Sequence, residues 1–213
     1  KNPTDSHHNL DVHQFCMTDS SMDVTFLEPA LAFTMRDDDV VPGIIIRNSE
    51  TGEGAFRADM YLHIKDADVG LIGDNQAYRT HRGKRLDQGL LNFTEDLTEE
   101  ELTIRRDMIM GMAYDPKPFA QWIMRMRANM SRTIEKPLET VTRATAEYGI
   151  PEYSEAILAR FINSDEMTKW TLAVAVATIA KLELPDERFR LERIAGRIAS
   201  EPLKTTQTNL EEP

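Results

Sequence analysis

The feature that most constrains the fold lies at residues 42–63, where two strand-like runs flank a polar turn that contains glycine. The first run, residues 44–46, is three isoleucines, a composition typical of strands. The second run alternates between two faces, Phe56, Ala58, Met60 and Leu62 on one and Arg57, Asp59, Tyr61 and His63 on the other. Alternation with a period of two beside such a turn predicts a β-hairpin.

Two more alternating runs, at residues 22–27 and 30–36, precede the hairpin and predict two further strands. Residues 1–21 are polar and carry no pattern, so we expect an irregular segment there. Residues 65–75 are polar and contain two glycines, which favours a loop. The first part of the chain is therefore predicted to be a small antiparallel sheet.

From residue 97 onward the apolar residues recur at helical spacing. Thr98 and Glu101 have the spacing of a capping box, and Pro116, Pro137 and Pro185 stand where first helical turns are expected. The helices that we expect span residues 98–114, residues from 116 onward, and residues 137–149, 152–163, 166–182 and 186–200. The helix at 166–182, capped by Ser164 or Asp165, is apolar nearly all round, so it should be the buried central helix.

These patterns predict the α+β class, with a small antiparallel sheet in the N-terminal half followed by a helical C-terminal half. A chain of 213 residues fits one domain with a helical extension better than two domains. Its expected parts are an irregular segment (1–21), a sheet with a basic segment (22–96), a helical part of the same domain (97–200) and a disordered tail (201–213).

The chain is acidic, with a formal net charge of -11, so any nucleic-acid binding would need a local basic patch. Its single cysteine, Cys16, excludes an internal disulfide and suits a reducing compartment, so we expect a cytoplasmic location, in the host cell if a phage encodes the protein. The longest apolar run, residues 171–184, is too short to span a bilayer and contains charges, so no membrane association is expected.

The strongest chemical signal is the basic segment at residues 78–85, which holds four arginine or lysine residues and a tyrosine. Such cations neutralise phosphates, and a tyrosine ring stacks on an unpaired base. If the polar face of the hairpin lies nearby, the candidate residues for single-stranded nucleic acid are Arg47, Arg57, Tyr78, Arg79, His81, Arg82, Lys84 and Arg85. Two alternatives stay open, pairing with the protein's own acidic helices and docking of an acidic partner.

Other candidate sites are weaker. The metal-like group His7, His8, His13 and Cys16 matches no standard zinc spacing, so we interpret it as a solvated terminal segment and expect no metal. The three aspartates at 37–39 are expected to form a solvated loop rather than a cation site. No catalytic constellation or nucleotide-binding loop is recognisable, so we expect no enzyme, no catalytic residue and no cofactor.

Methionines are frequent at helical spacing, at Met108, Met110, Met112, Met124, Met126 and Met130. This pattern is more typical of a core or a subunit interface than of an adaptable binding surface. Together with the possible free edge of the hairpin, it predicts a homo-oligomer or a protein partner.

The run from Pro42 to Ala55, with its turn Asn48-Ser49-Glu50-Thr51-Gly52, resembles the hairpin of the phage/plasmid-like protein family, domain-of-unknown-function family 932. That family also has a later basic stretch, matched by residues 79–87, and C-terminal helical motifs, matched by residues 168–172, 186–188 and 191–196. Its Cys-x-Asn-Gly motif is replaced here by residues 64–70. The resemblance implies a mixed α+β fold and an origin in a phage, plasmid or prophage, without an established activity.

Two classes of function remain open. In the first, the chain is a non-enzymatic accessory protein of a mobile element that binds single-stranded nucleic acid through the basic segment. In the second, it is an oligomeric structural or protein-interaction protein of a phage.

Overall fold

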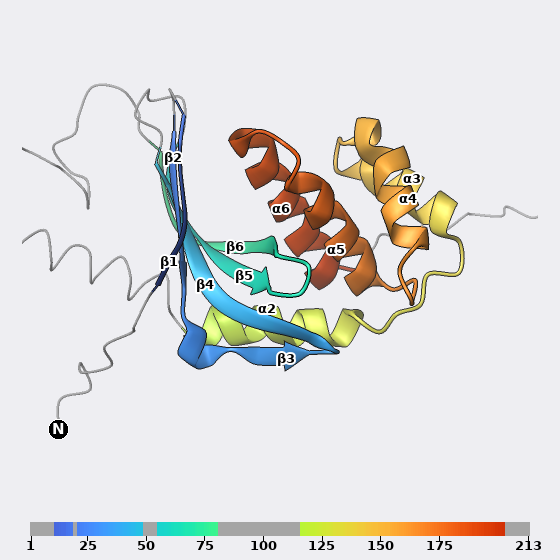
Figure 1. Ribbon diagram of the computed structural model, residues 1–213, viewed down its shortest axis with the longest axis horizontal. Coiled ribbons are helices and arrows are strands. Elements are labelled where there is room, and N and C mark those ends of the chain that lie inside the picture. Colours follow the sequence, from blue (N-terminus) through green and yellow to red (C-terminus); the bar gives the residue numbers. More distant parts are fainter. Residues whose placement is uncertain (1–10, 19–20, 49–54, 81–115, 203–213) are drawn as a thin grey trace, which may run out of the picture.

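The computed structural model describes residues 11–18, 21–48, 55–80 and 116–202, and it confirms the predicted α+β class (Figure 1). The N-terminal half is a sheet of six strands, β1 (Asp11–Met17), β2 (Met22–Leu27), β3 (Phe33–Met35), β4 (Asp38–Asn48), β5 (Ala55–Ile64) and β6 (Val69–Thr80). In the described part of the C-terminal half, the helices are α2 (Pro116–Asn129), α3 (Pro137–Glu147), α4 (Ser154–Ile162), α5 (Lys169–Ala180) and α6 (Pro185–Ser200). Short 3-10 turns lie at Pro29–Leu31 and Pro151–Tyr153.

The strands lie in the order β1-β2-β4-β5-β6, all pairs are antiparallel, and β3 lies beside the beginning of β4. The predicted hairpin is confirmed as the pair of β4 and β5, with Ile44 opposite Met60 and Arg47 opposite Arg57. Its predicted faces are confirmed as well, because Met60 belongs to the main core and Tyr61 to a separate cluster on the other face.

Three predictions about the N-terminal strands were wrong. Residues 11–17, expected to be irregular, form β1, which is held by its antiparallel pairing with β2. The run at residues 30–36 is divided between a 3-10 turn and the short β3. The aspartate run is not a loop throughout, because Asp38 begins β4 and its carboxylate accepts a hydrogen bond from the Trp170 indole at 2.5 Å.

The expected loop at residues 65–75 was also wrong, because only residues 65–68 form a turn and β6 begins at Val69. Its two glycines make room for aromatic rings. A Cβ at Gly70 would lie 2.2 Å from the Tyr61 hydroxyl oxygen, and a Cβ at Gly73 would lie 2.7 Å from the Trp122 ring. Glycine inside this strand therefore marks close packing rather than a turn.

The prolines correctly predicted the starts of α2, α3 and α6. The start of α5 was predicted three residues too early. Its N-cap is Thr168, whose side chain accepts from the Thr171 backbone N–H, while the Thr171 hydroxyl accepts from the Thr168 N–H. Ser164 instead donates to the Phe161 carbonyl at the end of α4. The predicted helix at 98–114 and all but the first two residues of the predicted tail lie outside the described residues.

The main core lies between the helices and one end of the sheet. Strand residues Met60, Leu62 and Leu71 pack there with Trp122 and Met126 of α2. Helix α5 is buried along most of its length, which confirms its predicted central position. Helix α6 lies between α5 and the edge strand β6 (Figure 1).

The contact of α6 with β6 is made backbone to backbone at Gly196. A Cβ on this residue would lie 2.0 Å from the Ile72 carbonyl oxygen. Any other residue at this position must push α6 away from the sheet. Within the described residues, no helix combines the length and the apolar character needed to cross a membrane.

We expect Gly196→Ala to lower the free energy of unfolding by about 2 kcal/mol, because the added methyl group overpacks the contact between α6 and β6. In an open helix the same change would stabilise by up to about 1 kcal/mol. Thr142→Ala, on the exposed side of α3, is the matched control and should be close to neutral. Urea denaturation measures both, and a Gly196→Ala variant as stable as the parent would contradict the packing of α6.

Candidate functional site

One half of the sheet extends beyond the main core. In this half, the face turned toward α6 is mostly polar and the opposite face is apolar. Its inner face, which is turned toward α6, carries Gln14, Cys16, Asp23, Thr25, Ile45, Arg47, Arg57, Asp59, Tyr61 and His63. Its outer face carries Val12, Phe15, Met17, Met22, Val24, Phe26, Ile44 and Ile46. A sheet with one solvated face normally buries the apolar side. Here the polar side is covered by α6, together with the apolar residues Leu27, Ile45 and Tyr61. On the opposite side Ile44 and Ala58 are buried, but Phe15 and Met17 at the edge are 58% and 70% exposed.

Arginines and carboxylates pair across the inner face, around the ring of Phe189 from α6. Arg47 forms ion pairs with Asp23, at 3.6 Å, and with Asp186 of α6. Arg57 pairs with the fully buried Asp59 at 3.0 Å. The guanidinium carbons of Arg47 and Arg57 lie 4.7 and 5.7 Å from the centroid of the Phe189 ring, within the range of cation–π attraction.

A second buried pair joins successive turns of α6, where the Arg188 Nε donates to the Glu192 carboxylate at 2.8 Å. Burial raises the pKa of Glu192, and the positive charge of Arg188 opposes the rise. Burial also raises the pKa of Asp23 and of Asp59, again opposed by their arginine partners. The charges of this face are therefore kept inside the protein by their partners.

A hollow of about 100 Å³ lies between these residues and the two outermost strands. Its lining includes Gln14 and Cys16 of β1, Thr25 of β2, and Arg188 and Glu192 of α6. It would accept a few water molecules or a small polar group rather than a large ligand.

The structure places the predicted nucleic-acid residues in two groups. The register brings Arg47, Arg57 and Tyr78 into one row across β4, β5 and β6, with Arg79 one position further along. Both hairpin arginines, however, are used in the internal ion pairs described above. His81, Arg82, Lys84 and Arg85 lie outside the described residues. For the two hairpin arginines, pairing with the protein's own acidic residues is thus the arrangement observed.

The methionines predicted to lie in a core or a subunit interface are also divided. Met126 and Met130 are buried in the core, whereas Met124 is exposed on α2. Met108, Met110 and Met112 lie outside the described residues.

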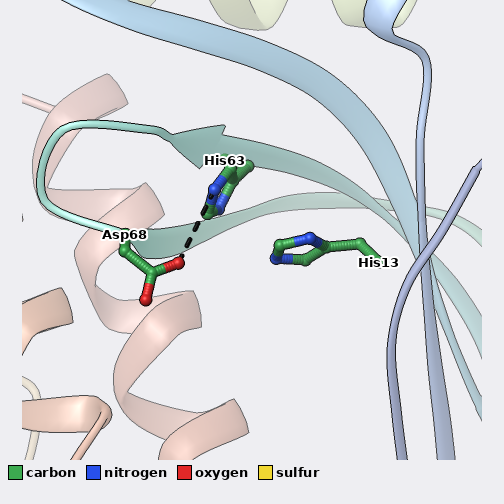
Figure 2. Close-up of side chains that lie close together, drawn as sticks. All are labelled: His13, His63 and Asp68. Carbon is green, nitrogen blue, oxygen red and sulfur yellow. Dashed lines mark ion pairs between the residues drawn. The ribbon is translucent and has the colours of Figure 1, made fainter.

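Three residues with metal-ligating side chains lie close together near the turn between β5 and β6 (Figure 2). They are His13 of β1, His63 of β5 and Asp68 of the turn between β5 and β6. One nitrogen or oxygen atom of each lies within 4.8 Å of those of the other two. The His63 Nε2 atom is 3.7 Å from Asp68 Oδ1, and the two imidazole centroids are 4.3 Å apart.

A bulge and the bend of the sheet bring these residues together. His13 has no partner in the register of β1 with β2, because the pairing shifts between Val12 and Gln14. Such an extra residue redirects a side chain out of the regular alternation. The sheet curves strongly between β1 and β5 (Figure 1). The side chains of His13 and His63 therefore meet, although β2 and β4 lie between the strands that carry them.

The surroundings of this cluster, burial above all, favour the neutral form of both imidazoles. Burial lowers the pKa of His63, and His13, Lys181 and Lys65 lower it further against the effect of Asp68. Burial likewise lowers the pKa of His13. Asp68 accepts a hydrogen bond from the Lys181 ammonium at 2.8 Å, which lowers the pKa of that carboxyl.

The sequence pattern included His13 as a candidate but grouped it with His7, His8 and Cys16 rather than with His63 and Asp68. Cys16 lines the hollow, whereas His7 and His8 lie outside the described residues. The alternation of the hairpin did place His63 on the polar face, but no local signal links it to Asp68 or to β1.

Comparisons with protein-family models, with curated proteins and with solved structures found no match to this chain. The resemblance to family 932 therefore stays a prediction.

We expect Arg188→Met to cost about 3 kcal/mol of unfolding free energy, because it leaves the buried carboxylate of Glu192 without its partner. The double variant Arg188→Met with Glu192→Leu should recover most of this loss, because it removes both buried charges. A double-mutant cycle by urea denaturation measures the coupling. If the losses of unfolding free energy in the two single variants add up to the loss in the double variant, the two side chains do not pair.

The loss in Arg188→Met should also depend on pH. Burial holds the folded-state pKa of Glu192 above its unfolded value, so this group contributes less stability as the pH rises through the folded-state value. Without Arg188 the pKa rises further. The destabilisation should therefore be larger at about pH 8 than at about pH 5.

Proposed function

We propose that this chain is a non-enzymatic, self-associating interaction protein, whose second copy binds the apolar outer face along β1. The observation that carries the proposal is the exposure of Val12, Phe15 and Met17 in a row on the edge strand. The neighbouring cluster of Ile44 and Ala58, with Phe26 and Ile46 against it, contains strand residues alone. Among the described residues, no helix side chain joins this cluster.

A second copy suits this face because β1 is an edge strand that can pair with itself. Proteins usually protect exposed edges with lysine, proline, a bulge or a covering element, and β1 contains neither lysine nor proline. Its bulge lies at His13 and leaves residues 14–17 in regular pairing with β2. Antiparallel pairing of two β1 strands is self-complementary, as a two-fold symmetric dimer requires. It would continue the sheet across both copies and bring the two apolar rows together.

A second candidate, binding of single-stranded nucleic acid, is favoured by one observation. The register gathers the positions of Arg47, Arg57, Tyr78 and Arg79 at the end of the sheet from which the basic segment continues. The internal ion pairs of Arg47 and Arg57 weigh against it. The origin in a phage, plasmid or prophage, and hence a host cytoplasm, remains part of this proposal and rests on the resemblance to family 932.

The proposal is tested by the mass of the protein in solution. The chain mass is 24.3 kDa, and we expect twice this value by sedimentation at micromolar concentration. Phe15→Lys with Met17→Lys should give a folded monomer, because two charges on the edge strand oppose its pairing. Leu182→Lys with Leu184→Lys is the matched control, since these side chains are 74% and 79% exposed elsewhere, and it should stay dimeric.

The dependence on salt concentration distinguishes the two candidate functions. Association through apolar side chains persists or strengthens as salt rises, whereas phosphate binding weakens steeply. A monomeric parent protein, or a dimer that survives both lysines on β1, would contradict the proposal. If the unmodified protein is a monomer and binds a single-stranded oligonucleotide only at low salt, nucleic-acid binding replaces self-association as the proposed function.

A further inference from the structure

We propose that His13, His63 and Asp68 form a binding site for one divalent transition-metal ion, with zinc as the best fit. The inference is independent of the proposed self-association, because it rests on the inner face and not on the outer one. It differs from the expectation, drawn from the sequence alone, that His13 belongs to a solvated segment without a metal.

The donor set selects the class of ion. Two imidazole nitrogens and one carboxylate oxygen suit zinc and its neighbours in the transition series, whereas calcium and magnesium prefer oxygen ligands alone. Three protein ligands leave the fourth tetrahedral position open to water or to a bound group.

The spacing is close to that of a bound site. Ligand atoms at about 2.0–2.2 Å from one zinc ion in a tetrahedron stand roughly 3.3 Å apart. The His63 Nε2 and Asp68 Oδ1 atoms are already 3.7 Å apart, and the whole set lies within 4.8 Å. His13 and Asp68 are exposed side chains, so small rotations of these two can close the remaining gap.

A second observation points to a missing partner at His63. His63 is only 8% exposed, and its Nδ1 atom is buried without a hydrogen-bond partner. The 3.7 Å separation of its Nε2 atom from Asp68 exceeds a hydrogen bond. An ion bound at Nε2 gives that nitrogen a partner, whereas the buried Nδ1 atom would still need one of its own.

The surroundings orient the ligands. Lys181 holds the other oxygen of Asp68 at 2.8 Å and leaves Oδ1 turned toward His63 (Figure 2). An outer hydrogen bond of this kind fixes the direction of a ligating carboxylate.

The test is a titration of the full chain with Co²⁺, followed by visible absorption, and with Zn²⁺, followed by calorimetry. We expect one ion per chain and, with Co²⁺, the intense absorption of a four-coordinate site. His13→Ala and Asp68→Asn should each weaken binding at least tenfold. Both positions are exposed, and Asn tolerates the positive φ of 50° at residue 68, so these variants should keep the fold.

Two control variants distinguish this site from adventitious metal binding elsewhere on the chain. Asp66→Asn changes an exposed carboxylate in the same turn and should leave the affinity unchanged. His7→Ala with His8→Ala removes the neighbouring histidines and should also leave it unchanged. The proposal is overturned if neither ion binds, if His13→Ala and Asp68→Asn bind as the parent does, or if the loss of His7 and His8 abolishes binding.

Discussion

The layer of arginine–carboxylate pairs beneath α6 determines how the rest of the molecule is arranged. Arg47 reaches from β4 to Asp186 on α6, and Phe189 packs among the guanidinium groups. Because this polar face is covered by a helix, the apolar face of the same strands is turned outward. Replacing one member of such a buried pair leaves an uncompensated charge, so the layer depends on all its members. The backbone contact at Gly196 holds α6 in the position that the layer requires.

This inversion links the two proposals. On the outside, an edge strand without lysine or proline carries exposed apolar side chains, and a second copy would cover them. On the inside, the strong curvature of the sheet brings His13 within reach of His63, whose buried Nδ1 atom lacks a hydrogen-bond partner. The bulge at His13 serves both faces, because it turns this one side chain inward while Phe15 and Met17 stay on the outer face. The two proposals thus rest on the two faces of one folded sheet.

The parts of the fold that could be predicted are those whose cause is local. The alternation around residues 44–62 predicted the hairpin, and the prolines predicted helix starts, because both signals act within a few residues. Strand β6 could not be predicted, since Gly70 looks like a turn residue until the Tyr61 ring lies against it. The metal-like cluster was missed for the same reason. Its members lie on separate elements, and only the tertiary fold unites them.

The central claim, that the polar face is buried and the apolar face is outside, can be tested on adjacent residues of β2. In a Cys16→Ser background, single cysteines at Val24 and Thr25 lie on opposite faces of one strand. The rate of thiol labelling, measured at a protein concentration low enough to keep copies apart, reports which face is covered. We expect the cysteine of Val24→Cys to be labelled at least tenfold faster than that of Thr25→Cys. Equal rates, or faster labelling at residue 25, would contradict it.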